Sequence, residues 1–332
     1  MSYHELFLQR GYRMTNSLSA LGLEQSCLME AIRKAARSEN TRIAYEKGWN
    51  CFSAWCQSVD LAPQEAQAVD IVRFLVAMAH EGSSSGKPLA LNTLRLYRSG
   101  INDHLRRACT RSPGSDRIVD EALKGLARLL GDTPRRVKAL REHQISAMLK
   151  SCSDGLHGLR DAAVLSLGFA AALRRSELCR LTMGDIVCKG ADGIVLHLRK
   201  SKTDPQGTGQ TVAVIQGNSI KPIAHVERWL RAANIGEGYL FQTLRRGGIA
   251  SGRPLDSGDV ARIVKRHARL IGLDPREYSG HSLRAGFVTC AAAYHARIDK
   301  IMEVTRHKSA QTVLKYIRDE ESFVDHAGTS FL

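Results

Sequence analysis

The sequence predicts a mainly α-helical protein of two domains, with a small β-sheet in the C-terminal domain. The chain has 332 residues, which is enough for two domains of ordinary size that each bury a core. Apolar residues recur at helical spacing along most of its length. Only Gly193–Lys200 and Gln210–Ile215 show the alternation of paired strands, and the loop between them contains proline and glycine.

The N-terminal part of the chain is predicted to form a flexible arm followed by a helical bundle. Residues 1–23 have weak periodicity and are expected to form a flexible N-terminal arm. Residues 24–130 are expected to form the bundle, with helices at Cys27–Ala36, Thr41–Gln57, Gln67–His80, Leu91–Cys109 and Asp116–Leu130. The apolar stripe predicted for the fourth helix is Leu94, Tyr97, Ile101 and Leu105, and that for the last is Ile118, Ala122, Leu126 and Leu129. No catalytic motif lies in this bundle.

Residues 131–139, with the sequence GDTPRRVKA, are expected to link the two domains, because glycine, proline and basic residues interrupt the helical pattern there.

The second domain then covers 140–332. Its expected elements are helices at Glu142–Ser151, Gly158–Arg174, Ile223–Ala233 and Ser257–Ile271, the two strands above and a short strand at Tyr239–Gln242. In the last of these helices, Val260, Ile263, Val264 and Leu270 are expected to face inward.

The charge balance favours a polyanionic partner. The formal net charge is +15, and the basic residues are spread along the chain rather than gathered in a tail. Neither a secretory signal nor an apolar run long enough for a membrane helix is visible, so no membrane association is expected. The eight cysteines form no CxxC pair and have no histidine at ligand spacing. This pattern predicts a reducing, cytoplasmic location and no metal site.

The stretch from Ser279 to Asp319 carries the chemistry. His281 and Arg284 are three residues apart at the start of a helical pattern, where neighbouring side chains can converge on one anion. A second pattern follows in which His307 precedes Tyr316 by nine residues. A tyrosine hydroxyl can attack phosphorus, but its ordinary pKa of about 10 requires a nearby base or a strongly positive field. The stretch therefore predicts covalent catalysis on a phosphodiester.

Six residues occur in an order that resembles the tyrosine recombinases, also called phage-type integrases. They are Arg174 in LRRSEL, Lys202 in SKTD, His281 and Arg284 in GHSLR, His307 in RHKS, and Tyr316 in LKYIR. Within this family the chain looks most like the Cre-type enzymes. The resemblance implies a helical core-binding domain plus a catalytic domain, and site-specific DNA cleavage and rejoining through a covalent 3′-phosphotyrosyl intermediate. Neither metal nor ATP is expected as a cofactor.

The chemistry of the reaction assigns a role to each residue. Arg174 and Arg284 would neutralise the phosphate oxygens, and His307 would add a hydrogen bond. His281 could take the tyrosine proton. A lysine would protonate the departing 5′ oxygen, and the resemblance of the SKT sequence to the family's loop favours Lys202 over the competing candidate Lys200. Glu177, one turn after the first arginine, is expected to orient cationic neighbours in a supporting role.

Similarity to the core-binding domain of Cre-type recombinases suggests that Arg42, Asn92 and Arg95 contact DNA. Four further basic residues are candidates on helical faces, namely Arg98, Arg262, Lys265 and Arg266, although such faces can also be simply solvated. The expected partner is double-stranded DNA with an inverted-repeat recombination site. In the family, four protomers assemble on two such sites, and residues 320–332 are the candidate segment for docking into a neighbouring protomer.

Two other functions remain open at this point. A type IB topoisomerase-like enzyme would use the same chemistry to relax supercoils. A catalytically inactive DNA-binding regulator would keep the basic surface without the reaction, but none of the six catalytic positions is replaced here.

Overall fold

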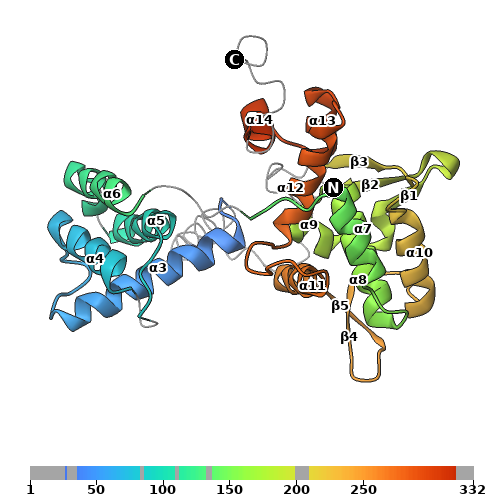
Figure 1. Cartoon of the computed structure of the whole chain (residues 1–332). Coiled ribbons are helices and arrows are strands. Elements are labelled where there is room, and N and C mark those ends of the chain that lie inside the picture. Colours follow the sequence, from blue (N-terminus) through green and yellow to red (C-terminus); the bar gives the residue numbers. More distant parts are fainter. Residues whose placement is uncertain are drawn as a thin grey trace, which may run out of the picture. The chain divides into compact units, whose positions relative to one another are not determined.

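The computed structural model describes residue 27 and residues 36–82, 86–108, 112–131, 137–198 and 209–318. The chain divides into two compact units, Met1–Pro134 and Arg135–Leu332, and helices dominate both of them (Figure 1). The division falls within the stretch predicted as a linker. The predicted N-terminal arm, nearly all of the first predicted helix and the predicted docking segment lie outside the described residues. In the described ranges no helix is long and apolar enough to cross a membrane.

The described part of the first unit contains four long helices in the order that the sequence predicts. They are α3 (Glu39–Ser58), α4 (Ala68–His80), α5 (Leu91–Ala108) and α6 (Arg117–Leu130), with a short 3-10 turn at Pro113–Ser115 before α6. Side chains fix two of the starts, because Ser38 accepts a hydrogen bond from the Thr41 backbone N–H and Asp116 accepts one from the Ile118 N–H.

Two glycines let α3 and α5 cross closely. A Cβ atom at Gly48 would lie 2.8 Å from the Cα of Tyr97, and one at Gly100 would lie 2.5 Å from the backbone oxygen of Tyr45. Each glycine therefore removes a steric overlap between the two backbones. The core beside this crossing is aromatic, with Phe52 and Phe74 in an edge-to-face contact at 5.2 Å between ring centroids.

The apolar stripe predicted for α5 is confirmed, because its four members are all at most 3% exposed. The stripe predicted for α6 is confirmed at Leu126 but is wrong at Ile118 and Leu129. Ile118 is 43% and Leu129 is 84% exposed, whereas Val119, Leu123 and Leu126 are buried. The buried set follows the i, i+4, i+7 spacing of one helix face, so the face that packs against α4 is rotated by about one residue from the predicted one.

The second unit has eight helices and five strands in its described part. The helices are α7 (Glu142–Lys150), α8 (Leu156–Ala170), α9 (Arg175–Arg180), α10 (Pro222–Ala233), α11 (Ser257–Leu270), α12 (His281–Ala293), α13 (Ile298–Thr305) and α14 (Ala310–Arg318). The strands are β1 (Ile186–Cys188), β2 (Ile194–Leu198), β3 (Gln210–Val214), β4 (Gln242–Leu244) and β5 (Ala250–Pro254).

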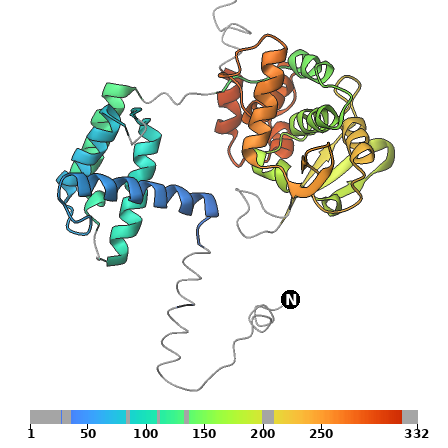
Figure 2. The same ribbon diagram turned by 90° about the horizontal axis from the view of Figure 1, so that it is seen from below.

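The predicted hairpin forms the larger sheet, which is antiparallel in the order β1-β2-β3 and lies at the edge of the unit (Figure 2). Its register pairs Ile194 with Val214 and Leu198 with Gln210. Strand β1 has three residues, which is too short to leave an alternating pattern. The short strand predicted at Tyr239–Gln242 begins later, as β4, and Tyr239 itself makes only an isolated bridge to Thr182.

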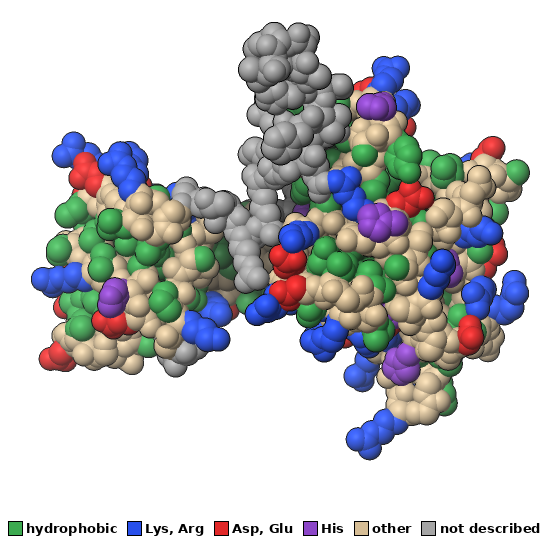
Figure 3. All heavy atoms as spheres, viewed as in Figure 1, with side chains coloured by type: hydrophobic (Ala, Val, Ile, Leu, Met, Phe, Trp, Pro, Cys, Tyr) green, Lys and Arg blue, Asp and Glu red, His purple; other side chains and the backbone are tan. Residues whose placement is uncertain are grey.

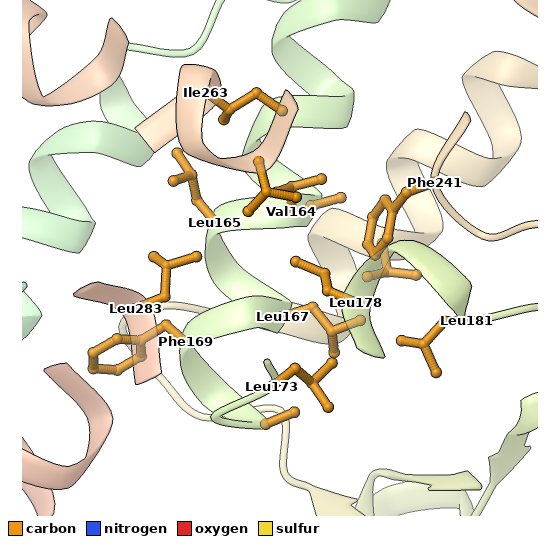
Figure 4. Packing of buried hydrophobic residues seen from close by; sticks show 14 of the residues in the cluster. Val164, Leu165, Leu167, Phe169, Leu173, Leu178, Leu181, Phe241, Ile263 and Leu283 are labelled. Atoms are coloured by element: carbon orange, nitrogen blue, oxygen red, sulfur yellow. The ribbon is translucent and has the colours of Figure 1, made fainter. Parts of the chain in front are cut away.

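Helix α8 is the centre of the second unit, where α7, α9, α10, α11 and α12 all contact it. Its residues Val164, Leu165 and Leu167 are fully buried, and Leu178, Phe241, Ile263 and Leu283 from other segments surround them (Figure 4). A helix that is covered on all sides is apolar over most of its surface, which explains the run from Ala162 to Leu173 that only Ser166 and Gly168 interrupt.

The end of α8 differs from the prediction, which extended this helix to Arg174. The helix ends at Ala170, and the N–H groups of Ala172 and Leu173 donate to the carbonyls of Phe169 and Gly168. This is a Schellman turn, and Ala172 takes its left-handed position with φ of 45°. Arg174 consequently lies beyond α8, at the residue that caps the start of α9.

A buried polar network ties α7, α8 and α11 together. Asp161 is 1% exposed. Its carboxylate forms ion pairs with Arg160 and Arg266 and lies 3.2 Å from Nε2 of His267. The Nδ1 of His267 lies 2.8 Å from the Ser151 hydroxyl. Burial and the nearby Arg266 lower the pKa of His267 to about 4. Because the Asp161 carboxylate can only accept, the neutral imidazole carries its proton on Nε2 and donates it to Asp161.

Candidate active site

Arg284 is the most buried cation of the candidate site. It lies one turn into α12, is 1% exposed, and donates from Nη1 to the Ala172 carbonyl at 2.7 Å. Its Nη2 is buried and has no hydrogen-bond partner among the described residues. Burial, together with the positive charges of Arg174 and Arg306, lowers its pKa to about 9. A buried guanidinium with an unused donor is suited to receive an anion.

Arg174 is held by a carboxylate. Its backbone N–H donates to Oε2 of Glu177 at 2.8 Å, and its Nη1 donates to Oε1 at 2.6 Å. Glu177 is 4% exposed. Burial alone would raise the pKa of this carboxyl, but the charge of Arg306 and the hydrogen bonds from Arg174 outweigh it, so the pKa is lowered. Glu177 is therefore ionised and fixes the direction of the Arg174 side chain.

His281 and Tyr316 meet although they are 35 residues apart. The Nε2 of His281, the first residue of α12, lies 3.2 Å from the hydroxyl oxygen of Tyr316 on α14. The residue as a whole is exposed, but desolvation of the ring and the charges of Arg284, Arg175 and Arg174 lower the pKa of His281. The imidazole is thus neutral near pH 7 and can accept a proton from the phenol.

His307 occupies the turn between α13 and α14, and its ring centroid is 6.1 Å from that of Tyr316. Thr305 decides where the proton of this imidazole sits. The threonine Oγ1 lies 2.6 Å from the Ile301 carbonyl, which can only accept, so the hydroxyl proton is used there. The same oxygen is 2.8 Å from Nδ1 of His307 and must accept from it. A neutral His307 therefore carries its proton on Nδ1 and has a lone pair on Nε2.

The charge state of His307 follows from its surroundings. Burial is the largest cause, and the charges of Arg284, Arg174, His281 and Arg306 act in the same direction, so the pKa of His307 is lowered to about 4. The ring is neutral near pH 7 without a bound anion. To donate a hydrogen bond from Nε2 while it keeps the bond to Thr305, the ring must gain a proton.

Arg306 is a member of this site that the sequence reasoning missed. It is 8% exposed and donates from Nη2 to Oε2 of Glu177 at 2.7 Å. The only signal in the sequence is its position next to His307, and a lone arginine is normally expected at the surface.

The structure thus brings together five of the six residues predicted as catalytic, namely Arg174, His281, Arg284, His307 and Tyr316. The sixth, Lys202, and its competitor Lys200 lie in a loop outside the described residues. Arg175 and Arg180 are exposed. In the described ranges no group of three or more His, Cys, Asp or Glu residues could hold a metal ion.

The predicted DNA-contacting residues of the first unit are engaged with neighbours to different degrees. Arg42 donates to Glu39 at 2.9 Å, and Arg95 donates to Asn92 at 3.1 Å, both on the same helix. Arg98 has a structural function, because its Nε donates to the Gly114 carbonyl at 2.7 Å and its Nη2 lies 2.8 Å from Asp120. It joins α5 to the turn before α6 and to α6 itself.

The basic face predicted on α11 is partly neutralised. Arg262 pairs with Asp259, Arg266 pairs with Asp161, and Lys265 is exposed. Leu270, which was expected to face inward, is 61% exposed, so that prediction is wrong. The helix ends at this residue, where the core no longer covers it. Lys and Arg side chains are spread over both units in Figure 3 rather than gathered in one patch.

Comparison with known proteins gives a consistent result. The family model described as "Phage integrase family" matches residues 138–322. The chain is 31% identical over 299 residues to an integrase/recombinase xerD homolog of Selenomonas ruminantium, which covers 88% of this chain and 85% of that protein. It is 24% identical over 315 residues to the recombinase cre of Escherichia phage P1, over 89% of each chain. The identity is higher with the xerD homolog, so the comparisons support the family but not specifically the Cre-type subdivision.

The fold has counterparts among solved structures. A lambda integrase dimer bound to a COC′ core site superposes with a TM-score of 0.59 at 20% identity, over 90% of this chain and 94% of that one. At this level of identity the match concerns the fold, and it confirms the predicted architecture of a helical domain followed by a mainly helical domain with small sheets.

Proposed function

This chain belongs to the phage integrase family, and from that premise we propose how its own side chains cut and rejoin DNA. It is a tyrosine-type site-specific recombinase. One observation carries the proposed mechanism, namely the 3.2 Å between Nε2 of His281 and the hydroxyl of Tyr316, close to buried Arg284 with its unused Nη2 donor. A nucleophile, its base and an anion-binding cation are the parts that attack on a phosphodiester requires.

In the first step, the oxygen of Tyr316 forms a bond to phosphorus while the bond to the 5′ oxygen of the next nucleotide breaks. The phenol proton passes to Nε2 of His281, which the lowered pKa keeps neutral and able to accept. The departing 5′ oxygen takes a proton from Lys202, or from Lys200 if that residue occupies the position. The product is a 3′-phosphotyrosyl bond and a free 5′ hydroxyl.

Charge stabilisation comes from Arg174 and Arg284. Two guanidinium groups can neutralise the two non-bridging oxygens, whose charge increases as phosphorus becomes five-coordinate. His307 contributes a hydrogen bond to the same oxygens when it is protonated, because its neutral form presents a lone pair on Nε2. The fixed position of Arg174, held through two contacts to Glu177, means that little reorganisation is needed at the moment of reaction.

The second step reverses the first on another strand. The phosphotyrosyl bond retains the energy of the phosphodiester, so a 5′ hydroxyl of the partner duplex can attack it and release Tyr316. No step of this sequence passes through a metal ion or a nucleotide. Exchange of strands follows when four protomers hold two inverted-repeat sites together, which is the family's arrangement, and residues 320–332 would dock into the neighbouring protomer. The core-site dimer of lambda integrase agrees with a DNA-bound oligomer. The place of action is the cytoplasm.

A trapping experiment tests this function. The protein is incubated with duplexes from the DNA that flanks its gene. Each duplex has a nick placed so that the short fragment carrying the new 5′ hydroxyl dissociates after cleavage and cannot reverse the reaction. The expected product is a protein–DNA adduct that survives denaturation and is absent for Tyr316→Phe. Linked target sites in a plasmid should be exchanged. Relaxation without exchange would indicate a topoisomerase-like enzyme, and binding without an adduct would indicate a regulator; either result would overturn the proposal.

A further inference from the structure

Arg306 adopts a backbone conformation that arginine does not favour. It is the C-terminal cap of α13 with φ of 57° and ψ of 41°, in the left-handed region, and its N–H donates to the Met302 carbonyl at 2.7 Å. Glycine takes this helix-ending conformation without strain, whereas a residue with a Cβ pays a conformational cost. The side chain must therefore make interactions that offset this cost.

Those interactions are with one carboxylate. The Nη2 of Arg306 lies 2.7 Å from Oε2 of Glu177, and the two side chains are 5% and 2% exposed. Its Nη1 donates to the Val304 carbonyl at 3.2 Å, and its buried Nε has no hydrogen-bond partner within the described residues. Breaking a buried ion pair from one side leaves an uncompensated charge in the interior. Arg306 and Glu177 are thus strongly dependent on one another.

Glu177 also holds Arg174, so it joins two parts of the site that are 129 residues apart in sequence. On one side is α9, whose first capping residue is Arg174. On the other is the turn from α13 to α14, with His307 directly after Arg306 and Tyr316 nine residues further on. A single carboxylate therefore fixes the segment that carries the nucleophile relative to the segment that carries a phosphate-binding arginine.

The charges lead to the same conclusion. With Glu177 alone, the positive charge of Arg174 would be cancelled at 2.6 Å. With Arg306 added, two guanidinium groups share one carboxylate, and the group of three keeps a net charge of +1. That charge remains available to an anion beside Arg284, whose own pKa is lowered by both arginines.

We propose that Arg306 is a positioning residue of the recombination reaction: its ion pair with Glu177 sets the distance between the Tyr316 segment and Arg174 and keeps Arg174 electrostatically available to the scissile phosphate. This inference rests on the proposed function. It assigns to Arg306 no contact with the reacting atoms. Its effect on cleavage is exerted through Glu177.

The test measures two quantities separately, namely affinity for target DNA by gel shift and the single-turnover rate of adduct formation on a nicked duplex. Arg306→Gly relieves the backbone strain and removes the side chain, so it should fold; its melting temperature checks this. We expect its adduct rate to fall by about 10- to 100-fold, with DNA affinity within about threefold. Arg297→Gln is the matched control, because that arginine pairs with Asp299 at 3.0 Å at the start of α13 but is 79% exposed, and it should cleave like the wild type.

Compensation provides the decisive readout. Arg306→Gln leaves the Glu177 carboxylate partly unpaired, and adding Glu177→Gln removes that charge. The double variant should therefore cleave at least about fivefold faster than the product of the two single defects predicts. The inference is overturned if folded Arg306→Gly cleaves at the wild-type rate, if affinity falls as much as cleavage, or if the two defects simply multiply. These outcomes differ from failure of the proposed function, in which the wild type itself would form no adduct.

Discussion

Replacing Thr305 by valine tests how His307 is used. Valine has nearly the shape of threonine but no hydroxyl, so it removes the oxygen that lies 2.8 Å from Nδ1 of His307. In the wild type the neutral ring presents a lone pair on Nε2 and must gain a proton to donate to a phosphate oxygen. In Thr305→Val the neutral ring can carry its single proton on Nε2 instead. The variant should therefore not need the second proton.

The magnitude follows from the charges that face this ring. Without DNA, burial and the neighbours Arg284, Arg174, His281 and Arg306 lower the pKa of His307 to about 4, and the ring of Tyr316 lies 6.1 Å away between centroids. A phosphate charge at about 4 Å contributes roughly 4 kcal/mol at an effective dielectric constant of about 20, which is about three pKa units. Binding of the phosphate therefore raises the pKa of His307. The donated hydrogen bond is present below this raised pKa and is lost as the pH rises through it.

The assay compares single-turnover adduct formation by the wild type and Thr305→Val between pH 5.5 and 8.5, with Thr305→Ser as the control that keeps the hydroxyl. The ratio of wild-type to variant rate should be constant at low pH and fall once the pH exceeds the pKa of His307 in the complex. The ratio should level off after a decrease of roughly 5- to 150-fold. The neutral wild-type ring can still adopt the tautomer with its proton on Nε2, at a cost of about 1–3 kcal/mol because the lone pairs of Nδ1 and of the Thr305 oxygen then face each other. Parallel profiles for all three proteins would refute this reasoning, as would nitrogen chemical shifts that place the wild-type proton of His307 on Nε2.

Two predictions concern stability. Gly100→Ala should lower the free energy of unfolding by about 1–3 kcal/mol, because its Cβ would overlap the Tyr45 backbone. Gly125→Ala, which meets nothing within 4 Å, should be neutral or stabilising by up to about 1 kcal/mol in the same denaturant titration, and equal effects would contradict the close helix crossing. His267 has a folded pKa of about 4, so the unfolded chain binds more protons at acid pH, and this residue should cost roughly 2 kcal/mol of stability between pH 7 and pH 5. A His267→Gln variant should show a shallower decrease over that range, and an unchanged slope would show that His267 is not the titrating group.

Local patterns predicted the elements well where one face of a helix packs against a single partner. The α5 stripe is such a case, since its four apolar residues leave one choice of buried face. Helix α6 has apolar residues at both 118–119 and 129–130, so its pattern alone could not choose between two faces. Strand β1 was missed because three residues form a strand only by pairing with β2.

The candidate site also contains residues that local sequence predicts and residues that only folding brings into place. Motifs predicted the candidate catalytic residues that the structure brings together, because chemistry on a phosphate requires particular side chains in a particular order. They could not predict Arg306 or Thr305, whose effect depends on contacts to Glu177 and His307 that exist only after folding. The position of Arg174 was also misjudged, because its helix ends in a turn formed by alanines rather than by glycine.

That turn connects the two arginines that we propose bind the phosphate. Arg174 follows Ala172 by two residues along the backbone, and Arg284 is fastened to the carbonyl of the same Ala172 at 2.7 Å. Any displacement of the tip of α8 would carry both guanidinium groups with it and leave their mutual spacing unchanged. The two guanidinium groups of the proposed phosphate site are thus anchored to the same turn before any DNA is bound.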